Sequence, residues 1–226
     1  MTDTTRLAEK LTARFENIQS GCLTNHNQIT LVVSPSHLLS ICEALRDEDE
    51  FLFSQLIDLC GVDYSAYGEV NWATHETTST GFSRGRNKNT ISTNSGEERF
   101  AVVYHLLSIE HNHRLRIRCH LPEDNPVLPT VTKIWSSADW YEREAYDMFG
   151  ILFEGHPDLR RLLTDYGFIG HPFRKDFPLE GHVEVRYDTD KQKVVNQPVT
   201  ISNRVLVPRV IRDDNRYIAD EESSDD

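Results

Sequence analysis

The hydrophobic positions near the start of the chain recur with helical spacing. Leu7, Leu11, Phe15 and Ile18 lie three or four residues apart, and Gly21 follows them. An apolar stripe with this period that ends at a glycine predicts an amphipathic helix. Because the stripe covers only one side of the helix, we expect it to pack on a core formed by later residues.

The next apolar runs predict a strand, a second helix and a further short element. Residues 28–33 read as a short strand, and Ser34-Pro35 opens the helix, with the serine as N-cap and the proline at the first helical position. Residues 53–64 predict either a strand or a short helix. The buried stripe of the second helix is expected at Leu38, Leu39, Ile41, Cys42 and Leu45.

Two later segments are the clearest strands of the chain. Residues 100–109 and 114–121 are joined by a short polar stretch, which predicts a hairpin. In the second segment Leu115, Ile117 and Cys119 alternate with arginines, so one face is expected to be buried and the other wet.

A third helix is predicted after a short helical turn at residues 131–135. Asp139 is expected to cap it and Gly150 to end it. Together the elements predict an α+β fold, with N-terminal helices packed on a small mixed or antiparallel sheet, followed by an irregular loop region and an extended C-terminal tail. The residues expected on the buried face of the third helix are Tyr141, Ala145, Met148 and Phe149.

Two segments depart from this pattern and set the domain organisation. Residues 65–99 are rich in Ser, Thr, Asn and Gly, which predicts a loop insertion in a domain of residues 1–188. Residues 194–211 hold many Val, Ile and Leu side chains without helical spacing, so we expect a tail, residues 189–226, that becomes ordered against a partner. Its acidic end, residues 220–226, is expected to be disordered.

Charge excludes several classes of partner. The 226 residues include 24 Lys and Arg against 36 Asp and Glu, a formal net charge of −12. Nucleic acid and anionic membrane surfaces attract basic faces, so neither is an expected partner. The first residues lack the layout of a secretory signal, and we expect the chain to stay where it is made.

The cysteines do not predict a redox or metal centre. Cys22, Cys42, Cys60 and Cys119 are widely spaced, and none forms a Cys-x-x-Cys pair. Scattered cysteines in a chain of this length, without an export signal, are typical of buried thiols. We therefore predict no zinc or iron–sulfur site and no bound cofactor in this chain.

Residues 139–188 carry most of the functional information. Two Gly-His-Pro triplets, at 155–157 and 170–172, lie among many aromatic and charged residues. Proline disfavours the helical region for the preceding histidine, so each triplet predicts a turn. Irregular backbone held by side chains, with more aromatic residues than a small core needs, predicts a surface that binds another chain.

The charged residues and the histidines allow three chemical alternatives. Glu142 and Glu144 lie about 200° apart on a helix, so they cannot share a substrate atom, and Asp147 is expected to pair with Arg143. A metal site is possible if His105 and His120 meet across the hairpin, with His111 and His113 in its turn, but solvated or hydrogen-bonded histidines are favoured. Alternating signs around Arg160-Arg161 and Arg174-Lys175 favour a structural network over an anion pocket.

Four motifs between residues 140 and 187 resemble those of a known family. WYEREAYDMFG at 140–150, GHPDLRRLLTDYGF at 155–168, GHPFRKDFPL at 170–179 and EVRY at 184–187 resemble the 30-kDa subunit of respiratory complex I, known in bacteria as the C subunit of NADH-quinone oxidoreductase. The likeness extends over 103–107 and back to 58–64.

The resemblance implies a non-catalytic structural and assembly subunit of the peripheral arm of a proton-translocating NADH:ubiquinone oxidoreductase. FMN and the iron–sulfur clusters would be held by partner chains. The nearest partners would be the 49-kDa-like subunit and the iron–sulfur subunits B and I, on the cytoplasmic face of the bacterial inner membrane. The residues assigned to a partner interface and structural network are Glu142, Arg143, Glu144, Asp147, His156, Asp158, Arg160, Arg161, Asp165, Tyr166, His171, Arg174, Lys175 and Asp176.

Two other functions compete with this interpretation. The first is the equivalent subunit of a membrane-bound hydrogenase or formate hydrogenlyase, whose subunits share this signature. The second is a stand-alone hydrolase that uses Glu142, Glu144 or Asp147, which turnover by the purified monomer would favour.

Overall fold

The computed structural model describes residues 3–16, 19–65, 67 and 98–201. Those before Ile201 belong to one compact unit, formed by Met1–Gly68 and Ser92–Thr200. Most of the predicted insertion at 65–99, the predicted tail after residue 201 with its acidic end at 220–226, and Ile18 lie outside the described residues.

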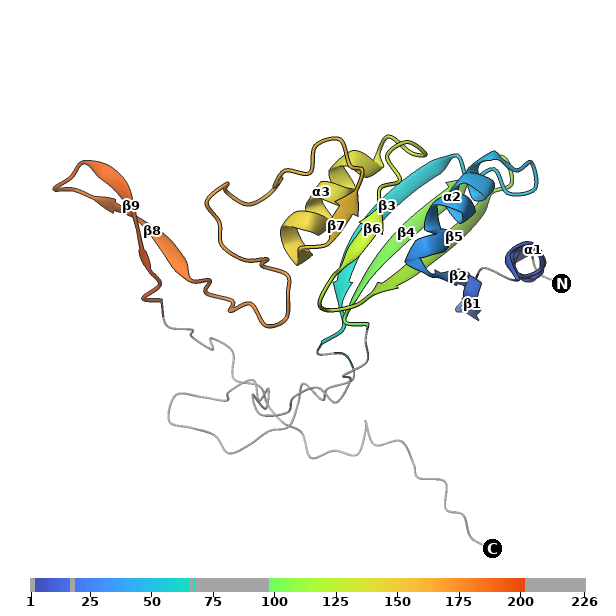
Figure 1. The fold of residues 1–226 in the computed structure, drawn as a ribbon, viewed down its shortest axis with the longest axis horizontal. Helices are drawn as coiled ribbons and strands as arrows, with labels where there is room; N and C mark the ends of the chain where they lie inside the picture. The colour runs from blue at the N-terminus through green and yellow to red at the C-terminus, as the bar shows by residue number, and fades with distance from the viewer. Residues whose placement is uncertain (1–2, 17–18, 66, 68–97, 202–226) are drawn as a thin grey trace, which may run out of the picture. The chain divides into compact units, whose positions relative to one another are not determined.

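A five-stranded mixed sheet forms the centre of this unit (Figure 1). All neighbouring strands run antiparallel except β2 and β5, which are parallel and therefore need a crossover connection. The sheet confirms the predicted α+β class. In spatial order the strands are β1 (Gln19–Asn25), β2 (Gln28–Val33), β5 (His113–Leu121), β4 (Phe100–Ser108) and β3 (Gln55–Asp63).

Strands β4 and β5 form the predicted hairpin. Leu115, Ile117 and Cys119 of β5 are buried in the core, as their alternation with arginines predicted. In the register of the hairpin, Ile117 lies opposite Tyr104. Residues 53–64 adopt the strand alternative, β3, which pairs with the other edge of β4.

Strand β1 was not predicted. Its sequence, QSGCLTN, has no run of apolar residues. It forms because the edge of β2 offers backbone partners, and Cys22 of β1 lies opposite Leu31 of β2. Backbone hydrogen bonds of this kind depend on the neighbouring strand and little on the side chains.

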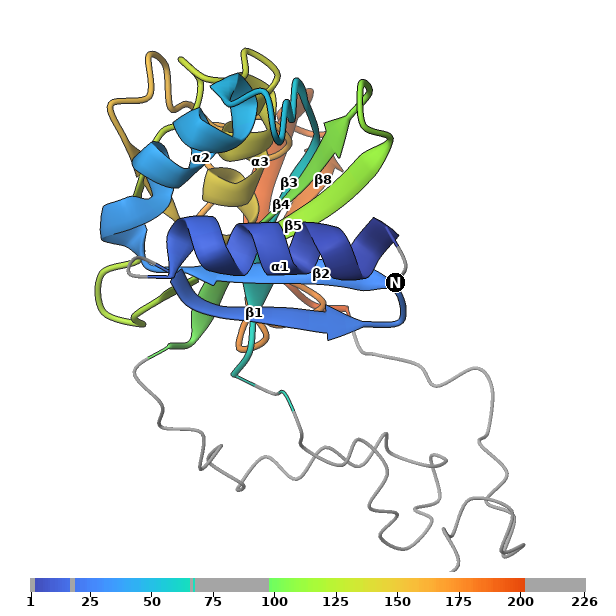
Figure 2. The ribbon, with the colours of Figure 1, turned by 90° about the vertical axis from the view of Figure 1, so that its right-hand side faces the viewer.

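Helix α1 (Asp3–Phe15) runs along β1 and β2 (Figure 2). Its predicted stripe of Leu7, Leu11 and Phe15 is buried, and the ring of Phe15 stacks on Phe51 with centroids 5.9 Å apart. Burying a leucine or phenylalanine side chain contributes roughly 2 kcal/mol, so this stripe explains why α1 stays on the sheet.

Helix α2 begins later than predicted. Pro35–His37 forms a single 3-10 turn, η1, and the α-helix spans Leu38–Asp47 with His37 as N-cap. Ser34 precedes the 3-10 turn, but its hydroxyl group makes no capping bond and lies 2.7 Å from that of Ser36.

Helix α3 (Ala138–Phe149) begins at the N-cap Ser137, so the prediction of Asp139 as the cap is wrong. Asp139 lies in the first turn, where its negative charge still favours the positive end of the helix dipole. The predicted end at Gly150 is confirmed, because this residue has the left-handed φ of 76°.

The α3 region is bound to the edge strand β3. Its predicted helical turn at 131–135 is present, closed by a hydrogen bond of 3.0 Å from the Trp135 amide to the Val131 carbonyl. Three side chains then donate to carbonyl oxygens in or beside β3, which occupies acceptors that a free sheet edge would expose. These bonds are Trp135 Nε1 to Phe53 (3.1 Å), Ser137 Oγ to Leu56 (3.3 Å) and Tyr141 Oη to Ile57 (2.9 Å).

Four short strands form two small two-stranded sheets. Strands β6 (Val127–Pro129) and β7 (Leu152–Glu154) pair in parallel, and β8 (Val183–Asp188) pairs antiparallel with β9 (Lys193–Pro198). The β8–β9 hairpin crosses the domain boundary predicted at 188, so the first residues of the predicted tail pair with the last of the predicted domain. Residues 155–182 contain neither helix nor strand, which confirms the irregular loop region.

None of the described helices combines the length and the hydropathy that a membrane span requires.

Candidate functional site: a polar network beneath exposed apolar side chains

The irregular segment, residues 155–182, is joined to the C-terminal end of α3. The last carbonyl groups of a helix have no partner within it, and here four of them find one. The Gly150 amide donates to Tyr146, which closes the helix. The irregular segment supplies the other three donors to backbone carbonyl oxygens. His171 Nδ1 donates to the carbonyl of Asp147 (3.0 Å), the Phe173 amide to that of Met148 (3.1 Å), and Arg174 Nε to that of Phe149 (2.7 Å).

The side chain of Asp147 holds residues 162–164 of the irregular segment. One carboxylate oxygen accepts the backbone amides of Leu162 (3.0 Å), Leu163 (2.7 Å) and Thr164 (2.9 Å). The other accepts Arg161 Nη1 at 2.9 Å and the Thr164 hydroxyl group at 2.5 Å. A buried carboxylate thereby organises three consecutive amide groups into a tight turn.

These bonds fix the charge of Asp147. Burial by itself would raise the pKa of this carboxyl group. The hydrogen bonds from Thr164, Leu163 and Leu162 outweigh burial and lower the pKa to about 2. Arg161 also donates to the Gly170 carbonyl at 3.0 Å and lies over the Phe168 ring. Asp147 is therefore ionised at neutral pH and unsuited to act as a general acid or base.

A second buried carboxylate, Asp63 at the end of β3, holds the other end of the irregular segment. It accepts Arg99 Nε at 3.1 Å, Arg99 Nη2 at 3.0 Å and the backbone amide of Lys175 at 2.8 Å. Arg99 also reaches Glu123 (2.6 Å) and Asp176 (3.0 Å). Burial would raise the pKa of Asp63, but the bonds from Arg99 and Lys175 lower it to about 2. Asp63, two residues before the predicted insertion, and Arg99, its last residue, are thus joined to the irregular segment.

Glu142 forms a third buried site, on the side of α3 toward β6. It accepts the Thr130 hydroxyl group at 2.5 Å and the Val131 amide at 2.8 Å. Burial raises its pKa to about 7, although these bonds act in the opposite direction. The buried His156 side chain lies 3.8 Å from its carboxylate and 3.1 Å from the Asp139 carbonyl.

The histidine of the first Gly-His-Pro triplet has a defined tautomer. His156 Nδ1 lies 3.0 Å from the Asp158 backbone amide, which can only donate, so Nδ1 accepts and the proton of the neutral ring is on Nε2. Nε2 then donates to the Asp139 carbonyl. This arrangement fits a structural tie between the triplet and the start of α3.

Large apolar side chains point to solvent from the same part of the chain. Tyr166 is 82% exposed, Ile169 75% and Leu179 91%. A single exposed apolar residue is ordinary, but several on one segment are typical of a binding surface. The exposed apolar set comprises Trp140, Leu163, Tyr166, Ile169, Phe173 and Leu179.

The structure joins most of the predicted network residues but changes one pairing. Asp147 pairs with Arg161, so the predicted Arg143–Asp147 ion pair is wrong. Arg143 instead donates to the carbonyls of Arg160 (3.0 Å) and Arg161 (3.3 Å). An arginine in the facing loop reaches the carboxylate because the tight turn brings it there, which helical spacing could not predict.

The remaining predicted residues lie at the surface. Asp158 and Arg160 form an exposed pair at 2.7 Å, which contributes little to stability. Glu144, Asp165 and Tyr166 are exposed. Lys175 takes part through its backbone and Asp176 through Arg99.

Asp63 and Arg99 were not among the predicted network residues. Asp63 lies two residues before the predicted insertion and Arg99 is its last residue, and the only signal was a charged residue near each end of a polar stretch. Thr130 and Thr164 were not predicted either, because the sequence around a loop threonine does not indicate which carboxylate its hydroxyl group will bind.

The histidine alternative does not match the register of the hairpin. His105 lies opposite Arg116, whereas His120 lies opposite Ala101, four positions away along β4. Burial lowers the pKa of both histidines, so both are neutral at neutral pH. The arrangement of residues 105 and 120 gives no shared metal site.

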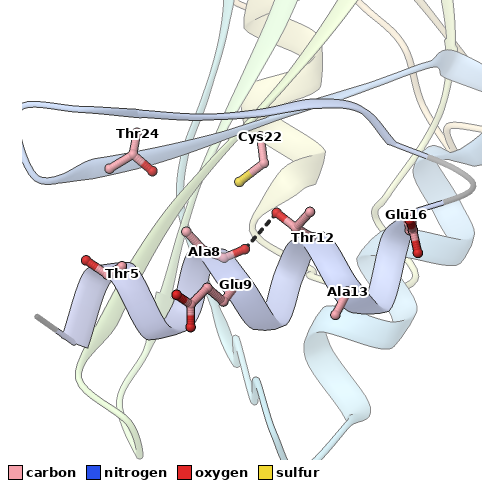
Figure 3. Close-up of a pocket in the computed structure, with 8 residues that line it drawn as sticks. All are labelled: Thr5, Ala8, Glu9, Thr12, Ala13, Glu16, Cys22 and Thr24. Atoms are coloured by element: carbon pink, nitrogen blue, oxygen red, sulfur yellow. Dashed lines mark hydrogen bonds between the residues drawn. The ribbon is translucent and has the colours of Figure 1, made fainter. Parts of the chain in front are cut away.

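A hollow between α1 and β1 is unrelated to the network (Figure 3). It measures about 430 Å³, and the Cys22 thiol points into it beside Thr12, whose hydroxyl group donates to the Ala8 carbonyl. Burial raises the pKa of Cys22, so this thiol is not activated as a nucleophile.

In this fold, buried carboxylates hold an irregular segment that presents apolar side chains to solvent. Comparison with known proteins gives the family of the chain. The profile described as the respiratory-chain NADH dehydrogenase 30 Kd subunit matches residues 31–183. The chain belongs to this family, as the resemblance predicted, and the family supports neither the hydrogenase nor the hydrolase alternative.

Relatives match over almost their whole length. The chain is 54% identical to the NADH-quinone oxidoreductase C subunit of Coxiella burnetii (strain Dugway 5J108-111), over 96% of both chains. It is 53% identical to the protein of the same name from Legionella pneumophila (strain Corby), over 100% of both.

Two solved structures are similar. A trypsin-resistant fragment of Nqo5 is 31% identical, with a TM-score of 0.48, over 69% of this chain and 98% of the fragment. A chain of the archaeal membrane-bound sulfane sulfur reductase is 20% identical, with a TM-score of 0.55, over 86% of this chain and 100% of that one. The second likeness concerns the fold alone.

Proposed function

We propose that this chain is a non-catalytic structural subunit of the peripheral arm of an NADH-quinone oxidoreductase, and that the exposed apolar set docks onto neighbouring subunits. One observation carries the docking proposal. Asp147 and Asp63, both buried and ionised, accept hydrogen bonds from backbone amides of one irregular segment and from the arginines beside it. A loop shape fixed in this way is expected where a partner recognises the shape.

The β8–β9 hairpin supports the same function. Val183, Val185 and Tyr187 alternate along β8 and share one face, and they are 52%, 65% and 58% exposed. An isolated two-stranded hairpin is marginally stable in water, and its apolar face gains stability when it is covered. We therefore infer that the hairpin and the residues that follow it extend the contact with partner chains.

The finer assignment follows the resemblance. We infer that the docking partner is the 49-kDa-like subunit, with the iron–sulfur subunits B and I nearby, on the cytoplasmic face of the bacterial inner membrane. FMN and the iron–sulfur clusters belong to partner chains.

A charge in the exposed apolar set tests the docking proposal. Ile169→Asp places a carboxylate where an apolar contact is expected and should reduce the amount of assembled complex by roughly tenfold or more. Ile109→Asp is the matched control, since Ile109 is an exposed isoleucine (59%) in the β4–β5 turn. The two variants are compared by native electrophoresis and by partner chains that co-purify with a tagged subunit. Equal assembly of both would refute the proposed surface.

Two further measurements separate the finer claims. A photo-crosslinking residue in place of Tyr166, the side chain that is 82% exposed, should capture the 49-kDa-like subunit. Capture of a different partner alone would replace that assignment while leaving the docking function intact. Flavin and iron analysis of the separated chain should show neither, and stoichiometric iron would contradict the assignment of the clusters to partner chains.

A further inference from the structure

Three metal-ligand side chains meet on neighbouring strands, away from the network described above. Asp58 and Cys60 lie two residues apart on β3, and His105 on β4 is the register partner of Asp58. One carboxylate oxygen, the thiol sulfur and one imidazole nitrogen all lie within 4.8 Å of one another. Residues two apart on a strand point to the same face, which brings both β3 side chains toward the histidine.

The spacing suits a tetrahedral ion. Zinc lies about 2.0–2.3 Å from nitrogen, oxygen and sulfur ligands, so its ligand atoms stand roughly 3.3–3.8 Å apart. The three ligand atoms lie within 4.8 Å of one another, so side-chain movements of about 1 Å would bring them to this spacing. The hydrogen bonds and ion pairs among the described residues leave the side chains of Asp58, Cys60 and His105 without a partner.

The surroundings leave the imidazole of His105 free to bind and hold Cys60 as a thiol until an ion displaces its proton. Burial lowers the pKa of His105, so its ring is neutral and has a lone pair at neutral pH. Burial raises the pKa of the Cys60 thiol, and Asp58 adds to the rise while Arg116 opposes it. The Arg116 guanidinium also donates a hydrogen bond of 2.8 Å to Gln28 Oε1, so one of its N–H groups is already occupied.

The group can be reached from solvent. Asp58, His105 and Arg116 contribute to the wall of a hollow of about 570 Å³ beside the β1–β2 turn. Asp58, Cys60 and His105 are all half-buried. Cys42, in contrast, is fully buried in the core and cannot be reached by an ion without unfolding.

We propose that Asp58, Cys60 and His105 form a binding site for a borderline divalent cation, with Zn²⁺ as the ion it takes and water as the fourth ligand. The set of one thiolate, one imidazole and one carboxylate suits zinc and disfavours Mg²⁺ and Ca²⁺, which take oxygen ligands. Binding replaces the thiol proton by the ion, so each Zn²⁺ releases one proton from Cys60 and affinity rises with pH. The bound ion links the edge strand β3 to β4.

This proposal departs from the prediction of no metal ligand in the chain. The cysteine spacing predicted no zinc site because the three donors come from two strands 45 residues apart, with a single cysteine among them. It is independent of the proposed docking function, which places no partner contact at these residues.

Zinc titration of the full chain tests the site. The purified chain is stripped with a chelator and titrated with Zn²⁺ at pH 7.5 by calorimetry, with Mg²⁺ as the negative control. We expect one Zn²⁺ per chain, and at least tenfold weaker binding in Cys60→Ser. Cys22→Ser, which alters another half-buried thiol, should bind as the original chain does. With Co²⁺ in place of Zn²⁺, a thiolate-to-cobalt charge-transfer band should appear and be absent only in the Cys60 variant.

A second variant covers the case in which Cys60→Ser does not fold, which circular dichroism would reveal. His105→Gln keeps the thiol and should weaken Zn²⁺ binding by at least tenfold, with the charge-transfer band reduced. Binding below one equivalent in the original chain overturns the proposal. So does zinc binding that neither variant changes, since it would come from other histidines or carboxylates.

Discussion

Asp147→Asn is the sharpest probe of the polar network, because it removes a charge while keeping the size of the side chain. The carboxylate has an ordinary pKa of 3.8 when the chain is unfolded and a pKa of about 2 when folded. A difference of nearly two units corresponds to roughly 2 kcal/mol of stability. The asparagine amide also places hydrogen atoms opposite Arg161 Nη1, which donates to the carboxylate at 2.9 Å. We expect the free energy of unfolding to fall by roughly 2–4 kcal/mol at pH 7.

The pH dependence distinguishes the charge from a general loss of packing. A carboxyl group whose folded pKa lies below its unfolded pKa stabilises the protein above the unfolded value, and this stability is lost as the pH falls toward the folded value. Between pH 7 and pH 3 the original chain should therefore lose about 1 kcal/mol that Asp147→Asn does not lose. The gap between the two proteins should narrow by that amount.

Urea unfolding of the full chain at both pH values, followed by tryptophan fluorescence, measures this gap. Asp158→Asn is the control, because Asp158 forms an exposed pair with Arg160 and should change stability little. If Asp147→Asn were as stable as Asp158→Asn, or if its gap to the original chain were the same at both pH values, the account of the buried carboxylate would be refuted.

Three further variants test other contacts. Gly61→Ala would place a Cβ atom 2.5 Å from the Phe149 ring and should cost roughly 1–3 kcal/mol in thermal unfolding, whereas Gly21→Ala, with no atom within 4 Å, should cost little. Gly150→Ala, at a φ of 76°, should destabilise by at least about 1 kcal/mol, and an unchanged melting temperature would contradict the left-handed helix end. Burial raises the pKa of Glu142 from 4.5 to about 7, which favours folding while the group is protonated, so stability is lost as the pH rises through this range. Glu142→Gln should lose less stability than the original chain between pH 5 and pH 7.5, by roughly 2 kcal/mol, in urea unfolding at the two pH values.

Much of the fold could be predicted because its elements carry their own periodicity. Leu7, Leu11 and Phe15 are buried in α1, as their spacing predicted. The alternation in β5 correctly predicted which of its side chains are buried and which face solvent. Strand β1 could not be predicted, since its residues have no apolar pattern and its pairing depends on the edge of β2. The N-cap of α3 was predicted at Asp139 and lies at Ser137, because serine and aspartate are both suitable caps.

The sequence predicted most residues of the candidate site but only some of the contacts between them. The dense charges of residues 139–188 indicated a network, and Asp147, Arg161, His171 and Arg174 belong to it. Local spacing favoured Arg143 as the partner of Asp147, and the structure gives that place to Arg161.

Periodicity, capping residues and charge density are local properties, so the sequence by itself determined the helices, the main hairpin and the region that holds the network. Contacts between segments far apart depend on where the backbone carries each side chain, and only the tertiary structure decided them. Asp63 accepts the Lys175 amide across 112 positions of the sequence, and the pairing of β3 with β4 places His105 opposite Asp58. No local pattern encodes such pairings, because they arise from burying all the apolar faces in a single core.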